Sequence, residues 1–123
     1  MLYVVKALRD GLKGVNIRVR VLKKNEPRVV KTKNSKEHKV ADLLVGDVSG
    51  VTGMSLWDEM INEIEIGELI DVRNGYVNSF KGRLRLNIGQ HGEMEKVEDD
   101  YFPSVSQILK NGRTNKKRGT ATE

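Results

Sequence analysis

The chain has 123 residues, 37% of them hydrophobic and 32% charged, which predicts one domain with a small core under a heavily charged surface. It contains no cysteine, so disulfides, thiolate catalysis and cysteine-ligated zinc are excluded, and we expect a reducing compartment. No apolar run approaches the roughly 18 residues that span a bilayer, and the N-terminus lacks a secretory pattern, so a cytoplasmic protein is expected.

The charge distribution favours a polyanionic partner. The net charge is +5, but residues 93–100 carry −4 and the last fourteen residues carry +4. Without these two segments the rest of the chain still has a charge of +5. The basic character therefore belongs to the body of the domain, where it can attract polyanions over long range.

The first half of the chain predicts three strands. Val5, Leu8 and Leu12 have the spacing of one or two helical turns over one end of a core, and residues 15–22 then alternate between apolar and polar side chains as a half-buried strand does. Residues 23–39 are basic, around a short apolar pair, and predict a long hairpin-like excursion with irregular edges. Two further strands are expected at 40–47 and 51–58.

The second half predicts one helix and two more strands. Residues 58–67 have the pattern of a short helix, with Asp58 as its N-cap and Gly67 at its end. Strands are expected at 69–77 and 82–89. We expect three parts: a domain over residues 1–92, an extended segment over 93–108 that packs on the domain or leaves it, and a flexible basic tail over 109–123.

This order of elements is typical of an all-β fold, the five-stranded OB-fold barrel with a short helix between strands 3 and 4. SH3-like barrels compete for such an order but normally lack that helix. The OB fold binds oligonucleotides on the face of strands 2–3 and in the loops that join strands 1–2 and 4–5.

Trp57 is the first candidate for base stacking. In the third strand Met54 and Leu56 share the apolar face, so alternation turns Trp57 outward. A core position is the alternative for any tryptophan. An outward ring on a binding sheet favours stacking on a base.

Tyr76 and Phe80 are the other two candidate rings. Strict alternation would turn Tyr76 inward, but a bulge at Asn74-Gly75 would turn it outward. Phe80 lies in the expected loop between strands 4 and 5, beside Lys81, where it could instead anchor the loop. Four cations near the rings are candidate phosphate contacts, although a solvated surface is their alternative: Arg28, Lys33, Arg73 and Lys81.

Several segments, in this order, resemble the short single-OB single-stranded-DNA-binding proteins of archaea and their eukaryotic relatives, the SOSS-B-like proteins. The matching segments are LRDGLKGVNIRVRVL (8–22), RVVKTK (28–33), LLVGDVSG (43–50), SLWDE (55–59), IEIGELIDVRNGYVNSFKGRLRLNIG (64–89) and YFPSVSQI (101–108). The resemblance implies that Trp57, Tyr76 and Phe80 stack on bases. It also implies that Val30 lies beside the bound DNA strand, with Arg28 and Lys33 near the DNA backbone.

Two features depart from that family. Many members have tryptophan where this chain has Tyr76, whose ring offers less stacking area. Many also have a longer tail that ends in an acidic cluster used by partners, whereas this chain ends in a short basic segment.

We therefore expect a protein that coats and protects single-stranded DNA with little sequence preference, in replication, recombination or repair. An RNA-binding OB module and a protein-interaction OB scaffold in a larger complex are the alternatives. No motif indicates an enzyme, a cofactor or a metal site, and His38 and His91 have no metal-spaced partner. We expect a monomer in isolation, located with the nucleoid, with replication or repair proteins as further partners.

Overall fold

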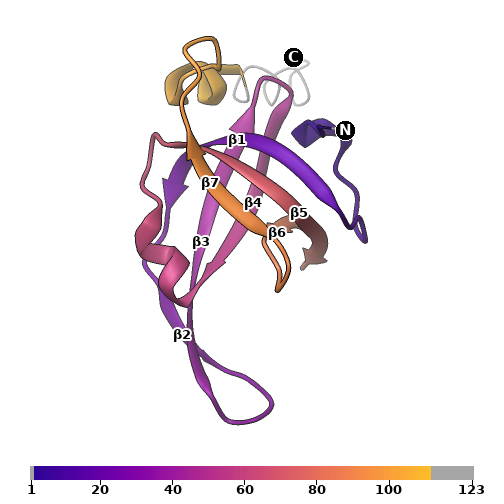
Figure 1. Cartoon of the computed structure of the whole chain (residues 1–123), viewed down its shortest axis with the longest axis vertical. Coiled ribbons are helices and arrows are strands. Elements are labelled where there is room, and N and C mark those ends of the chain that lie inside the picture. The colour runs from indigo at the N-terminus through magenta and orange to yellow at the C-terminus, as the bar shows by residue number, and fades with distance from the viewer. Residues whose placement is uncertain (1, 112–123) are drawn as a thin grey trace, which may run out of the picture.

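The structure is a computed structural model that describes residues 2–111, and strands form most of it (Figure 1). In these residues the strands are β1 (Val15–Lys24), β2 (Arg28–Lys31), β3 (Glu37–Asp47), β4 (Gly50–Trp57), β5 (Leu69–Phe80), β6 (Arg83–Asn87) and β7 (Glu93–Val97). The 3-10 helix η1 (Val5–Ala7) precedes β1, and the 3-10 helix η2 (Asp58–Glu63) follows β4. Residues 105–111 form an α-helix.

The seven strands belong to one sheet that closes on itself. Pairing runs in the order β1, β3, β4, β6, β5, and β5 pairs again with β1. Within this circuit only β4 and β6 are parallel neighbours. The strand β2 pairs with β3, and β7 pairs with β5, so these two lie outside the circuit.

The prediction of five strands was wrong, because the described residues form seven. The additional strand β2 lies in the basic excursion and pairs with the first residues of β3. Its four residues include only two apolar ones, too few to show an alternation in the sequence. The additional strand β7 lies in the acidic segment and is held by five residue pairs to β5.

The predicted position of the helix was also wrong. The segment that follows β4 is only the six-residue 3-10 helix η2, and it has no side-chain cap. Asp58 cannot act as its N-cap, because it is the first residue of η2 and its carboxylate accepts the backbone N–H of Lys39 from β3. The α-helix of the described chain lies instead at residues 105–111.

The inward faces of the strands form one hydrophobic core. Alternation in β1 is as predicted, since Val15, Ile17, Val19 and Val21 are fully buried. Each neighbouring strand contributes its own buried residues, such as Leu56 from β4 and Leu86 from β6. The core therefore fixes which side chains of each strand remain outside.

A bulge in β5 reverses which side chains point outward. Val72 and Gly75 are both buried although they are three positions apart, an odd spacing that strict alternation would place on opposite faces. In the pairing with β1 an extra residue of β5 lies between them, and Asn74 there has a left-handed φ of 57°. This confirms the expected bulge and places Tyr76 on the outer face.

A capping box starts the helix of residues 105–111. The backbone N–H of Gln107 donates to Ser104 Oγ at 3.2 Å, and the N–H of Ser104 donates to Gln107 Oε1 at 2.8 Å. Ile108 is buried and packs beside Gly46, where an added Cβ would stand 3.0 Å from Ile108 Cγ2. The helix thus lies against the end of β3. None of the helices within residues 2–111 has the length and apolarity needed to cross a membrane.

Candidate nucleic-acid interface

Trp57, Tyr76 and Phe80 all lie on the outer side of the sheet. Their exposed fractions are 43%, 40% and 54%, which are high for large apolar rings. Trp57 comes from the end of β4, and the other two come from the second half of β5. Between these two strands lies β6, which pairs with both. We call the outward surface of β3, β4, β6 and this half of β5 the ring face.

Trp57 is in contact with a histidine from the neighbouring strand. The ring of His38, in β3, meets that of Trp57 edge to face, with centroids 6.2 Å apart and an interplanar angle of 76°. His38 Nδ1 lies 2.8 Å from Asp58 Oδ2, and the N–H of Lys39 donates to Asp58 Oδ1 at 3.0 Å. These two contacts, the Lys39 bond foremost, hold the pKa of Asp58 below its usual range. Asp58 also has a left-handed φ of 52°.

Tyr76 lies opposite Asn87 of β6 and beside the loop that follows this strand. Gly89 in that loop has a φ of 80°, and a Cβ there would stand 3.1 Å from two carbons of the Tyr76 ring. Glycine thus lets the loop backbone come close to one side of the ring.

Phe80 is flanked by two cations. Lys81 Nζ lies 5.3 Å from the centroid of its ring, and the guanidinium carbon of Arg85 lies 5.4 Å from it. Both distances are in the range of cation–π attraction. Lys81 therefore lies beside a candidate ring, as the sequence predicts.

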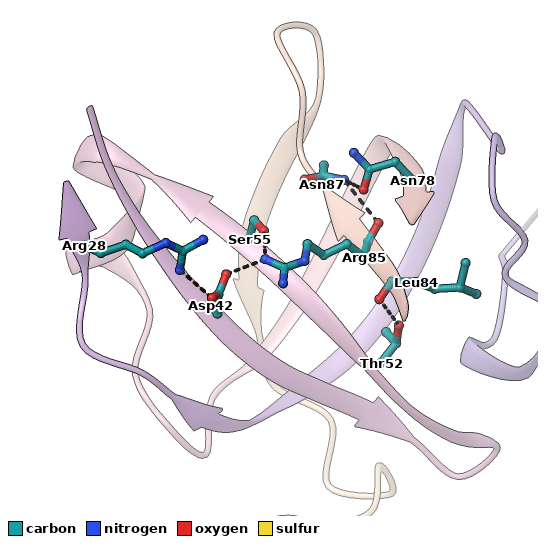
Figure 2. A network of polar contacts seen from close by, with 8 residues as sticks. All are labelled: Arg28, Asp42, Thr52, Ser55, Asn78, Leu84, Arg85 and Asn87. Atoms are coloured by element: carbon teal, nitrogen blue, oxygen red, sulfur yellow. Dashed lines mark hydrogen bonds and ion pairs between the residues drawn. The ribbon is translucent and has the colours of Figure 1, made fainter. Parts of the chain in front are cut away.

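A polar network joins side chains of β3, β4 and β6 on the ring face (Figure 2). Asp42 of β3 accepts Arg28 Nη1 at 2.6 Å and Arg85 Nη1 at 2.5 Å. Arg85 also donates to Ser55 Oγ at 3.1 Å, so its guanidinium is fixed from two sides. Asn87 Nδ2 donates to Asn78 Oδ1 at 3.1 Å. One carboxylate shared by two arginines leaves this group with a net positive charge.

The other candidates of the basic excursion lie along β2 and its turn. Val30 is half-buried and pairs with His38, which connects β2 to the surroundings of Trp57. Lys33 is exposed in the turn between β2 and β3, and its side chain has no partner among residues 2–111. Arg28, Val30 and Lys33 thus form an arm at one end of the ring face.

Arg73 is paired with acids of β7 and with no residue of the ring face. It precedes the bulge in β5, where its guanidinium lies 3.2 Å from Glu93 and 3.0 Å from Glu95. Both acids belong to β7. The sequence placed Arg73 near the rings because it is only three residues from Tyr76, but the bulge and β7 separate them.

The sequence does not single out Asp42, Ser55, Arg85 and Asn87 as candidate site residues. Alternation alone places Arg85 outward, because Leu86 beside it is buried. The sequence held no signal that β6 pairs with β4 in parallel, which brings Arg85 next to Gly53. Within residues 2–111 no group of acids and histidines is arranged to hold a metal.

The fold and the ring face define a class, the all-β OB-fold proteins. Within it the chain belongs to the family described as single-stranded DNA binding protein Ssb-like, OB fold, which matches residues 8–96. The chain is similar to the single-stranded DNA binding protein Ssb of Saccharolobus solfataricus, with 33% identity over 107 residues that cover 87% of this chain and 72% of the relative.

Solved structures with less sequence identity have the same fold. The replication factor A related protein of Methanobacterium thermoautotrophicum matches with a TM-score of 0.67 at 22% identity, over 80% of this chain and 92% of that one. Schizosaccharomyces pombe Pot1pC bound to ssDNA matches with a TM-score of 0.63 at 16% identity, over 93% and 98%.

Proposed function

We propose that this protein binds single-stranded DNA with little sequence preference. Bases would stack on Trp57, Tyr76 and Phe80, because every base offers a π-face that an exposed ring can cover. Duplex DNA hides those faces, so the preference for single strands follows from the same contacts. The observation that carries the proposal is the gathering of three exposed rings and several cations on one face of an OB fold.

The cations divide into those that would contact phosphates and one that would not. We place Arg28, Lys33 and Lys81 along the path of the strand, with Val30 beside it, and we add Arg85. We leave Arg73 outside the path, because Glu93 and Glu95 already neutralise it. In this proposal the closed circuit of five strands is the OB barrel that presents the path.

The comparisons support this ligand and suggest a setting. The Saccharolobus relative is named a single-stranded DNA binding protein, and the Pot1pC structure contains ssDNA. We propose that the protein coats and protects DNA single strands at the nucleoid during replication, recombination or repair, as a monomer that could meet proteins of those processes.

The test uses Trp57, the only tryptophan, as its own probe. We expect oligo-dT to quench the emission of Trp57 strongly and a duplex to quench it weakly. In a second measurement, Trp57→Ala should weaken the binding of labelled oligo-dT by about 1–3 kcal/mol while the domain stays folded. Unchanged affinity in the folded variant would exclude stacking on Trp57. A matched oligo-U titration decides between DNA and RNA. If no oligomer binds, a protein-interaction scaffold replaces the proposal.

A further inference from the structure

Lys23 and Arg83, two cations near the ring face, have no side-chain partner within residues 2–111. The side chains of Lys23, in β1, and Arg83, in β6, make no hydrogen bond or ion pair with any residue in 2–111. Arginines elsewhere on the surface differ from them. Arg18 is bound by Asp71 and Asp99, and Arg20 donates to three backbone carbonyls. The structure therefore uses some arginines to hold itself together and leaves Lys23 and Arg83 unused.

Lys23 and Arg83 line one hollow of about 370 Å³ on the outer side of the sheet. Its other lining residues include Asn25, Leu44, Gly53 and Arg85. No acidic residue lines it, and because Arg85 is already paired with Asp42, Lys23 and Arg83 are the two cations of the hollow without a carboxylate partner in residues 2–111. Like charges gathered in this way repel one another, and a bound anion would relieve the repulsion.

Strand pairing places this hollow next to the rings. Lys23 pairs with Leu44, Leu44 with Gly53, and Gly53 with Arg85, which forms one row across β1, β3, β4 and β6. The guanidinium carbon of Arg85, in this row, lies 5.4 Å from the centroid of the Phe80 ring. Arg83 pairs directly with Phe80. A DNA single strand with one base stacked on Phe80 would thus have its next phosphate near the hollow.

The floor of the hollow is open because of Gly53. Gly53 has no side chain between Leu44 on one side and Arg85 on the other, and Arg85 reaches toward Ser55 and Asp42 (Figure 2). A Cβ at Gly53 would meet Leu84 O at 3.4 Å and Arg85 Cγ at 3.8 Å, which are ordinary contacts. The backbone around Gly53 therefore has room for a Cβ.

We propose that this hollow is a phosphate subsite for the single strand, in which Lys23 and Arg83 contact one or two backbone phosphates and the sugar lies over Leu44 and Gly53. The inference rests on the proposed function and adds a direction to it: the bound DNA strand would run from Phe80 toward β1. It also assigns a role to two cations that neither the sequence pattern nor the network around Asp42 had used.

The first experiment measures the salt dependence of oligo-dT binding by the full chain. Each phosphate contact with a single strand contributes about 0.7 to the slope of log K against log salt. The double variant Lys23→Gln with Arg83→Gln should lower the slope by about 0.7 to 1.4. Lys96→Gln, on β7, removes a cation outside the hollow and should leave the slope as it is. An unchanged slope in the double variant, or an equal fall with Lys96→Gln, would overturn the subsite.

The second experiment places a charge on the floor. Gly53→Asp and Gly53→Asn add side chains of nearly equal size, but only the first repels phosphate. We expect Gly53→Asp to bind oligo-dT more weakly than Gly53→Asn at low salt, with the difference closing at high salt, while both keep the thermal midpoint of the parent. Equal binding by the two variants, while Trp57→Ala still weakens binding, would overturn the subsite and leave the proposed function standing. If the parent protein binds no oligomer, the subsite and the proposed function both fail.

Discussion

His38 and Asp58 restrain the ring that the proposed function depends on most. Trp57 is the last residue of β4, so regular strand structure restrains its backbone only from the N-terminal side. The edge of the His38 ring supports it from β3, and Asp58 holds His38 in place at 2.8 Å. Asp58 has a left-handed φ of 52°, a conformation that aspartate adopts more readily than most residues with a side chain.

We expect His38→Ala to free the Trp57 ring and weaken oligo-dT binding. Edge-to-face ring contacts contribute about 0.5–1.5 kcal/mol, so a loss of up to roughly tenfold in affinity is expected. The fluorescence anisotropy of Trp57 in the free protein should fall in the same variant. His38→Phe keeps a ring edge but loses the bond to Asp58, and it should lie between the parent and His38→Ala. Anisotropy equal to that of the parent in His38→Ala would show that the contact does not restrain the ring.

At this scale the sequence predicts which rings are exposed but not what surrounds them. Alternation places Trp57 outward because Met54 and Leu56 are required inside. The bond between Asp42 and Arg85 joins residues 43 positions apart, and it forms only because β6 is next to β4. Nothing in the local pattern of either residue indicates that neighbour.

Among the elements, the bulge of β5 decides where Tyr76 lies, and Gly75 makes it possible. A Cβ at Gly75 would stand 2.8 Å from the backbone oxygen of Asn87 and 2.9 Å from Val72 Cγ1. Such distances require the backbone to shift. The close approach of β5 to β6 at this point therefore needs glycine.

Gly75→Ala should destabilise the protein by about 1–3 kcal/mol, the usual cost of forcing extra atoms into a packed site. Urea unfolding followed by circular dichroism measures it. Gly53→Ala is the control, since its Cβ meets only ordinary contacts and should cost much less. If both variants unfold at the same urea concentration, the bulge can adjust and the packing argument fails.

The strands with clear alternation are those that the sequence predicts. In β1 four β-branched residues alternate with polar ones, and the prediction holds. In β2 and β7 apolar residues are too few to show a period, and pairing with a longer strand determines the structure. The C-terminal helix did have a signal, because Ser104 and Gln107 have the spacing of a capping box.

At the scale of the whole molecule, the charges fall into two regions. Three of the five acids of residues 93–100 pair with cations outside the ring face: Glu93 and Glu95 with Arg73, and Asp99 with Arg18. Lys23, Lys33 and Arg83, whose side chains have no hydrogen bond or ion pair within residues 2–111, lie on or near the ring face or on its arm. This division lets one molecule carry many acids without repelling a polyanion at its binding face.

The contact of Arg18 with Asp71 makes stability depend on pH in a defined direction. Arg18 binds both carboxylate oxygens of Asp71, at 2.6 and 2.9 Å, and this bond holds the pKa of Asp71 below its usual range. A carboxyl with a lowered pKa in the folded state stabilises the fold above its unfolded pKa of about 3.9. That stabilisation is lost as the pH falls through the folded pKa.

Arg18→Gln should therefore lower the free energy of unfolding at pH 7, measured by urea unfolding, by about 1 kcal/mol for a pair of this partial exposure. Below about pH 4 the gap between the two proteins should narrow, because protonation of Asp71 removes the same contact from the parent. Lys96→Gln breaks a more exposed pair with Glu68, 3.6 Å apart, and should show a much smaller gap at every pH. A gap for Arg18→Gln that stays constant from pH 7 to pH 3 would mean that Arg18 stabilises the fold through packing and its other contacts, and that its charge on Asp71 contributes little.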